Sequence, residues 1–216
     1  MIMDDRIIEN AIEFVKKTFE NDYSGHDYFH TLRVYRTATH IAERENADLI
    51  TVQLAALLHD VDDIKLSPQT HKYKDRAVGF LRSHGVAEST VETVCKIIDE
   101  VSFKGTDSVS PQTLEGMCVQ DADRLDAIGA IGIARAFAFG GNHNRVMHDP
   151  SVLPMQNMNE EQYRNSKSTT INHFYEKLFS LGGIMNTATA KEIAARREQY
   201  MKAYVEEFLD EWDGKK

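Results

Sequence analysis

Residues 54–60 read Leu-Ala-Ala-Leu-Leu-His-Asp, five apolar residues followed at once by two ionisable ones. An apolar run of this kind is typical of a helix that is buried on all sides. An unpaired carboxylate buried at the end of such a helix would cost several kcal/mol. His59-Asp60 therefore indicates either a helix end that faces solvent or a site where a partner offsets the charge.

Apolar residues recur at helical spacing along nearly the whole chain, and no segment shows the sustained alternation of a strand. The sequence therefore predicts an all-α protein with one domain over residues 1–216, its core motifs at 26–126. The first three expected helices span 4–20, 26–45 and 48–60. A fourth ends at Gly85, a fifth runs from a Ser89/Glu92 capping box to Val101, and a sixth runs from Ser110-Pro111 to Phe139. C-terminal helices within 160–212 (160–181 and 188–212) are expected to pack on this core.

Composition narrows the class of protein. The 216 residues are 42% hydrophobic and 27% charged, which excludes a disordered chain. The first residues lack the features of a signal peptide and no apolar run approaches 18 residues, so we expect a cytoplasmic protein without membrane contact. A net charge of −9 disfavours a nucleic acid polymer as partner. Cys95 and Cys118 are expected as small buried hydrophobes without a disulfide.

Two further segments concentrate ionisable groups within helical patterns. His26 and His30 are four residues apart, so their side chains share one helix face and could converge on one ion, or they are simply exposed. The segment 121–126 places three aspartates within an apolar helix, where Asp121 could pair with Arg124 and two carboxylates remain unexplained. Mixed nitrogen and oxygen ligands favour transition metals over Mg²⁺ or Ca²⁺.

The ordered set His30, His59-Asp60 and Asp123 resembles the H…HD…D signature of the HD-domain metal-dependent phosphohydrolase superfamily. The surrounding words GHDYFHTLRV (25–34), AALLHDVDD (55–63) and DADRLDAIGAIG (121–132) are similar to the bacterial branch that includes nucleotide pyrophosphohydrolases. Segments 144–146 and 168–185 extend the resemblance over nearly the whole chain. The resemblance implies a helical bundle with a metal site between its helices.

The resemblance also implies roles for individual residues. The implied ligands of one divalent transition metal are His30, His59, Asp60 and Asp123; Mn²⁺ is our first choice, with Co²⁺, Ni²⁺, Fe²⁺ and Zn²⁺ as alternatives. The family position three residues after the HD aspartate is Asp63, the expected group for orienting water or moving its proton, with Asp62 as the second choice. His26 is a further catalytic candidate, and His71 and His84 do not match the patterns of two-metal sites.

A phosphate substrate needs cations, and three basic residues are candidates. Arg33 follows His30 by three residues and therefore shares its helix face. Lys104 follows the end of a helix, and Arg145 lies in a loop of about twenty residues, 140–159, which is either a binding lid, our preferred interpretation, or a disordered segment. Each of the three could also be an ordinary surface charge.

The favoured function is hydrolysis of a nucleoside triphosphate to monophosphate and pyrophosphate by a metal-activated water. A nucleotide monophosphatase, a phosphodiesterase or a guanosine tetraphosphate hydrolase would use the same site. More remote alternatives are a diiron oxygenase, which needs further ligands, and a non-catalytic regulator that binds metal and nucleotide. The expected partner is a small phosphate ester or nucleotide, and a homodimer is left open.

Overall fold

The computed structural model describes residues 2–20, 27–64, 67–102, 108–158, 161–162 and 168–216, with side chains from residue 6 onward. Its ordered elements are helical and the described residues contain no strand, which confirms the all-α prediction. The chain divides into two compact units, one of Met1–Ser102 with Val109–Asp123 and one of Phe103–Ser108 with Arg124–Lys216. None of the described helices is long and apolar enough to span a bilayer.

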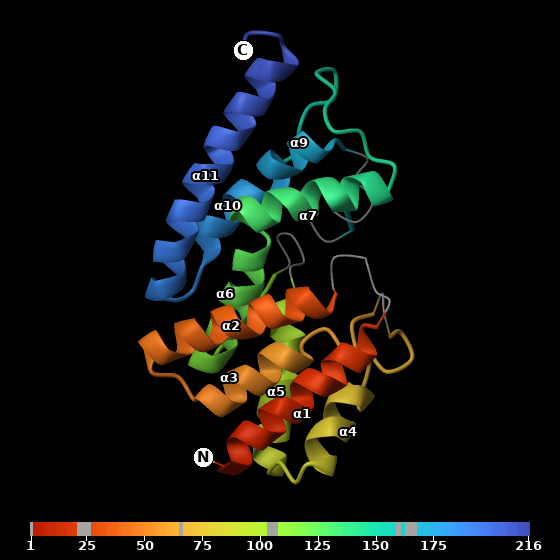
Figure 1. The fold of residues 1–216 in the computed structure, drawn as a ribbon, viewed down its shortest axis with the longest axis vertical. Helices are drawn as coiled ribbons and strands as arrows, with labels where there is room; N and C mark the ends of the chain where they lie inside the picture. Colours follow the sequence, from red (N-terminus) through yellow and green to blue (C-terminus); the bar gives the residue numbers. More distant parts are fainter. Residues whose placement is uncertain (1, 21–26, 65–66, 103–107, 159–160, 163–167) are drawn as a thin grey trace. The chain divides into compact units, whose positions relative to one another are not determined.

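The first unit is built around a short buried helix (Figure 1). This helix, α3 (Leu49–Leu58), packs against α1 (Ile2–Thr18), α2 (Tyr28–Glu45) and α5 (Glu88–Val101), while α4 (Asp75–Ser83) packs against α5. Buried residues occur on every side of α3, as its apolar sequence predicts. Its last residue is followed directly by His59-Asp60, so the core helix delivers these side chains to the interior of the unit.

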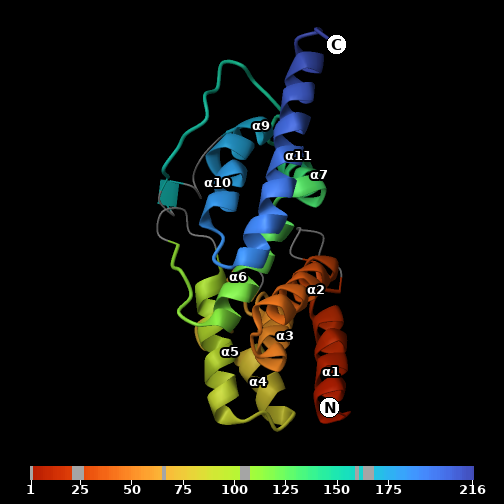
Figure 2. The same ribbon diagram turned by 90° about the vertical axis from the view of Figure 1, so that its left-hand side faces the viewer.

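The second unit contains α7 (Gly129–Asn142), a helical segment from Thr170 to Ile184 and the long α11 (Ala188–Trp212). The middle segment consists of α9 (Thr170–His173), a π-helical turn η2 (Phe174–Leu178), α10 (Phe179–Leu181) and a 3₁₀ turn η3 (Gly182–Ile184). Figure 2 shows α10 and α11 running along each other within this unit. Helix α7 packs against both α11 and α9.

Two predicted helix starts are wrong. Helix α5 begins at Glu88 with Ala87 at the cap, so Ser89 already lies inside the helix and forms no capping box. The Glu88 carboxylate instead pairs with Arg82 at the end of α4. Helix α6 (Leu114–Asp126) begins after the predicted Ser110-Pro111 start, because the Thr113 hydroxyl accepts the Gly116 amide at 3.1 Å and caps the helix there.

Two predicted continuous helices are interrupted. The segment expected to run to Phe139 breaks after Asp126, and α7 begins at Gly129, whose φ of +78° does not occur in a right-handed helix. The segment expected over 160–181 is extended at Thr169, whose hydroxyl accepts the Asn172 amide and opens α9. The predicted stop at Gly85 is confirmed, with a φ of +72°.

The long connection after α7 is attached to the helical segment that follows it. The amides of Thr170 and Ile171 donate to the carbonyls of Val146 and Met147 at 3.0 and 2.9 Å. Further along, the Asn172 side chain donates to the Val152 carbonyl at 2.7 Å, and the Glu176 carboxylate accepts the Met155 amide at 3.1 Å. These bonds hold residues 146–155 against α9 and η2, which argues against a freely opening lid.

Candidate metal centre

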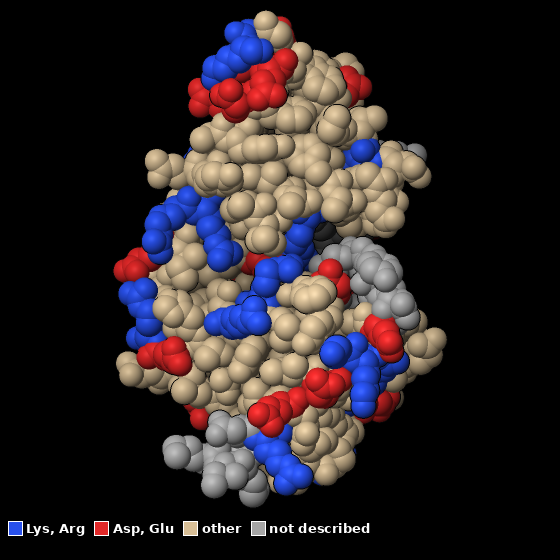
Figure 3. Space-filling model, in the orientation of Figure 1, with Lys and Arg blue, Asp and Glu red and all other residues tan. Residues whose placement is uncertain are grey.

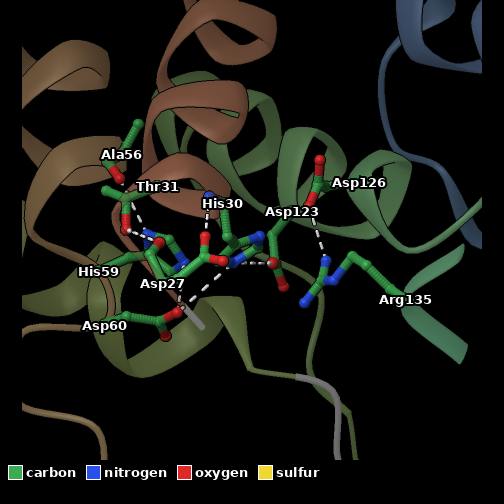
Figure 4. A network of polar contacts seen from close by, with 9 residues as sticks. All are labelled: Asp27, His30, Thr31, Ala56, His59, Asp60, Asp123, Asp126 and Arg135. Carbon is green, nitrogen blue, oxygen red and sulfur yellow. Dashed lines mark hydrogen bonds and ion pairs between the residues drawn. The ribbon is translucent and has the colours of Figure 1, made fainter. Parts of the chain in front are cut away.

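Four of the side chains singled out by the sequence converge within the first unit (Figure 4). Atom Nε2 of His30 lies 3.4 Å from Oδ2 of Asp60 and 3.5 Å from Oδ1 of Asp123, and Nε2 of His59 lies 3.2 Å from Oδ2 of Asp60. His30, His59 and Asp60 are buried, while the Asp123 side chain is 25% exposed. The cluster is therefore withdrawn from water except on the side of Asp123.

Local structure fixes the two histidines. The Asp27 carboxylate accepts the backbone amide of His30 at 2.7 Å and caps α2, which holds His30 in the first helical turn. Atom Nδ1 of His59 lies 2.8 Å from the Ala56 carbonyl, which can only accept, so Nδ1 carries the proton. Nε2 then points toward Asp60 and is the atom that can bind a metal, the arrangement usual for a metal-ligating histidine.

The dimensions of the cluster fit one metal ion. Ligand atoms of His30, His59 and Asp60 all lie within 4.8 Å of one another. Two ligands about 2.1 Å from a common ion stand about 3.0 Å apart at a right angle and about 4.2 Å apart on opposite sides. The buried Nε2 of His59 faces the Asp60 carboxylate oxygen at 3.2 Å, a separation that two ligands of one metal ion can have.

The electrostatics of the cluster also favour a cation. Burial alone would lower the pKa of His59, yet the nearby carboxylates of Asp60 and Asp123 and the Ala56 carbonyl outweigh it and raise the pKa to about 9. The cluster thus attracts positive charge strongly enough to hold a proton on a buried imidazole. A divalent cation meets the same demand, and the imidazole is then neutral.

The two adjacent aspartates after the cluster have different surroundings. The carboxylate of the buried Asp62 accepts the amides of Arg76 at 3.2 Å and Ala77 at 2.9 Å, and it therefore anchors the start of α4. Asp63 is only partly buried, and its amide donates to the Asp60 carbonyl at 3.0 Å in the turn after the cluster. Of the two, Asp63 has the accessibility that proton transfer requires.

The other predicted site residues are distributed as follows. Arg33 is partly buried on α2, one turn after His30. Arg145 belongs to the second unit, where its guanidinium lies 5.8 Å from the centre of the Phe139 ring. His26 and Lys104 lie outside the described residues.

The aspartates of segment 121–126 also separate by role. Asp123 joins the cluster, whereas Asp126 is buried in the second unit and pairs with Arg135 at 2.6 Å. The predicted pairing partner Arg124 donates to the Ile184 carbonyl. Sequence reasoning assigned no role to Asp27, although an aspartate three residues before His30 is the usual signal for a helix cap.

Comparison with known proteins gives the family. Residues 27–128 match the HD domain family model, a range that contains all four clustered side chains. The chain is 37% identical over 199 residues to the protein YpgQ of Bacillus subtilis, covering 91% of this chain and 89% of YpgQ. The chain belongs to the HD-domain superfamily.

Solved structures agree with this assignment to the HD superfamily. A protein of Lactobacillus plantarum matches with a TM-score of 0.86 and 40% identity over 97% of this chain and 98% of that one. An HD-superfamily hydrolase of Bacillus thuringiensis matches with a TM-score of 0.76, at the same identity and coverage. YpgQ in complex with ADP matches with a TM-score of 0.77 and 34% identity over 97% and 96% of the two chains. The protein is therefore a metal-dependent phosphohydrolase of the HD superfamily.

Proposed function

We propose that this HD phosphohydrolase cleaves nucleoside triphosphates to nucleoside monophosphate and pyrophosphate. The observation that carries the proposal is the convergence of two imidazoles and two carboxylates, those of His30, His59, Asp60 and Asp123, in a largely buried cluster that favours a cation. Superfamily membership supplies hydrolysis of phosphate compounds, and the ADP complex of the relative YpgQ supports a nucleotide as substrate.

The four clustered side chains are the proposed ligands of one divalent ion. When bound, such an ion lowers the pKa of a water molecule and neutralises charge on phosphate oxygens. Two imidazole nitrogens and two carboxylates favour Mn²⁺, with Co²⁺, Ni²⁺, Fe²⁺ and Zn²⁺ as alternatives. Four protein ligands leave positions of a six-coordinate ion open for water and substrate, as catalysis requires.

The proposed proton acceptor is Asp63. Its backbone bond to the Asp60 carbonyl places it in the turn directly after the ligand pair, and its side chain is partly accessible. A carboxylate in this position can orient a water molecule and take its proton. Asp62 is less suited, because both of its oxygens are engaged by the amides that open α4.

The proposed phosphate-binding residue of the first unit is Arg33. Its spacing of three residues from His30 places it on the same face of α2, and the residue is partly buried. A guanidinium can donate two parallel hydrogen bonds to a phosphate. A bound arginine neutralises charge that develops on phosphate oxygens during transfer. Arg145 and Lys104 stay sequence-based candidates for phosphate binding, and His26 stays one for catalysis.

The decisive experiment is product analysis over a panel of ribo- and deoxyribonucleoside triphosphates. Metal-free protein is re-supplied in turn with Mn²⁺, Co²⁺, Ni²⁺, Zn²⁺ or Mg²⁺, and the released phosphates are identified by ion chromatography. We expect pyrophosphate and nucleoside monophosphate from the metal-loaded protein and no product from Asp60→Ala, whose metal content is measured in parallel. Release of orthophosphate alone would replace the proposal by a phosphatase, and full activity of Asp60→Ala would remove the metal assignment.

A further inference from the structure

A pocket with a volume of about 410 Å³ lies between the start of α7 and the first half of α11, entirely within the second unit. The proposed hydrolysis uses none of its residues. Two arginines and a tyrosine project from α11, and the first two residues of α7 form the facing wall; the lining consists of Gly129, Ala130, Ile193, Arg196, Arg197 and Tyr200.

The pocket depends on a close approach of Arg197 to the backbone of α7. Gly129 has a φ of +78°, and a Cβ built on it would lie 2.9 Å from Cγ of Arg197. Only glycine allows both this backbone conformation and this contact. The Arg197 guanidinium donates to the Leu125 carbonyl, which fixes the side chain along one side of the pocket. The wall is therefore a rigid one, with a permanent positive charge.

The other two polar side chains of the pocket, Arg196 and Tyr200, are accessible to a bound molecule. Arg196 is exposed, and no described carboxylate lies within ion-pair distance of it. The Tyr200 ring is 57% exposed. Arginine and tyrosine side by side offer charge-assisted donors for a phosphate and an aromatic face for a planar ring.

The surrounding charges favour an anion in this pocket. Residues 188–202 of α11 carry four basic and two acidic side chains, whereas residues 203–212 carry four acidic side chains and no basic one. Figure 3 shows the corresponding gathering of Lys and Arg over the first half of α11 and of Asp and Glu toward its end. Two of the carboxylates in this region have basic partners of their own: Asp126 pairs with Arg135, and Glu198 pairs with Lys202 at 2.7 Å.

We propose that the pocket of Arg196, Arg197 and Tyr200 binds the phosphate group of a small molecule. Arg197 is the fixed donor, Arg196 the exposed one, and the buried Gly129 and exposed Ala130 at the start of α7 form the wall on the opposite side. The chemistry suits inorganic phosphate as well as the phosphate end of a nucleotide, whose base would lie against Tyr200. The inference goes beyond the proposed hydrolysis and holds whether or not that proposal does.

The test is a titration followed residue by residue with nuclear magnetic resonance. The full chain, labelled with ¹⁵N and loaded with diamagnetic Zn²⁺, is titrated with inorganic phosphate and separately with ADP. The reporters are the amides of Gly129 and Ala130 and the Nε–H groups of Arg196 and Arg197, while the residues around His30 report any binding at the metal cluster. We expect saturable shifts at the pocket reporters with phosphate.

Matched variants distinguish specific phosphate binding in the pocket from non-specific attraction of phosphate to the basic side chains of α11. Arg196→Gln should weaken phosphate binding about tenfold, the loss of one charge-assisted contact, whereas Lys191→Gln on the same helix leaves it unchanged. Ala130→Glu places a carboxylate in the pocket and should abolish binding, while Ala130→Gln retains it. Glutamate suits the first turn of a helix, so this variant folds.

The outcomes decide the proposal and the source of the phosphate. Absence of saturable shifts at Gly129 and Ala130, equal affinities of Arg196→Gln and Lys191→Gln, or undiminished binding to Ala130→Glu would each overturn it. Tighter binding of ADP than of phosphate, lost in Tyr200→Ala, identifies a nucleotide as ligand. Equal affinities for the two probes identify free phosphate. A failure of nucleotide hydrolysis affects none of these readouts.

Discussion

The two units of the chain handle charge in opposite ways. The first withdraws two imidazoles and a carboxylate, His30, His59 and Asp60, from water and brings the partly exposed Asp123 against them. The second leaves Arg196 at the surface and fixes Arg197 against a backbone wall. A buried ionisable group needs a partner to be stable, so its presence in an apolar helix is informative in the sequence, whereas an exposed arginine is compatible with any role.

Among variants that keep all four proposed metal ligands, Asp63→Asn is expected to have the largest effect on hydrolysis. The amide cannot accept a proton, so kcat should fall by about 10²-fold or more, while metal content stays that of the parent protein. The measurement combines steady-state kinetics with elemental analysis of the purified variant. An unchanged kcat would assign the proton acceptor to another group.

Asp62→Asn is the matched variant one residue away, and its expected effect is on folding. It removes the negative charge that holds the amides of Arg76 and Ala77, so the free energy of unfolding should fall by about 2 kcal/mol. Urea denaturation of the metal-free proteins measures this difference. If Asp62→Asn slows hydrolysis as much as Asp63→Asn at full stability, the division of roles between the two aspartates is wrong.

Gly129→Ala tests the second unit. A Cβ at this position meets the Arg197 side chain and a backbone of φ +78°, so we expect a loss of about 1–2 kcal/mol in the free energy of unfolding. The control is Gly141→Ala in the same helix, where no atom lies within 4 Å of the added Cβ. Equal stability of the two variants would contradict the close packing described for the pocket.

Arg33→Ala sharpens the assignment of phosphate binding to the first unit. Loss of a charge-assisted contact should reduce kcat/KM for nucleotides about tenfold without changing metal content. Arg36→Ala is the control, since Arg36 is an exposed residue on the same helix. An unchanged kcat/KM in Arg33→Ala would remove this residue from the substrate site.

A further expected effect is a pH dependence of the free energy of unfolding that originates in the second unit. Burial and the positive charges of Lys177 and Arg145 lower the pKa of His173 from 6.5 to about 3. Below pH 6.5 the unfolded chain binds a proton at His173, whereas the folded chain does not. The contribution of the neutral His173 to the free energy of unfolding is therefore complete above pH 6.5 and is lost as the pH falls toward 3. His173→Gln should therefore show a flatter decline in unfolding free energy between pH 6.5 and 4.5 than the parent protein, and parallel curves would exclude this origin.

The sequence was most informative where burial and charge conflict. The all-α class follows from helical periodicity. Ionisable residues within apolar helices indicated an ion site, and the resemblance to the HD superfamily implied that His30, His59, Asp60 and Asp123 form it. The sequence did not predict the break between α6 and α7. The apolar pattern continues across Gly129, and the positive φ of this residue does not change that pattern. Asp62 and Asp63 are indistinguishable by type, and only the start of α4, fourteen residues later in the chain, separates them.

The attachment of residues 146–155 to the following helices has a practical consequence for protein engineering. One end of the segment is held by main-chain bonds to Thr170 and Ile171, and the other by the side chains of Asn172 and Glu176. Between these anchors, Asp149 and its neighbours form a short turn in which the Asp149 carboxylate accepts the amide and the hydroxyl of Ser151. A reporter peptide or affinity tag inserted after Pro150 would leave both anchors in place, which makes this turn a natural position for grafting.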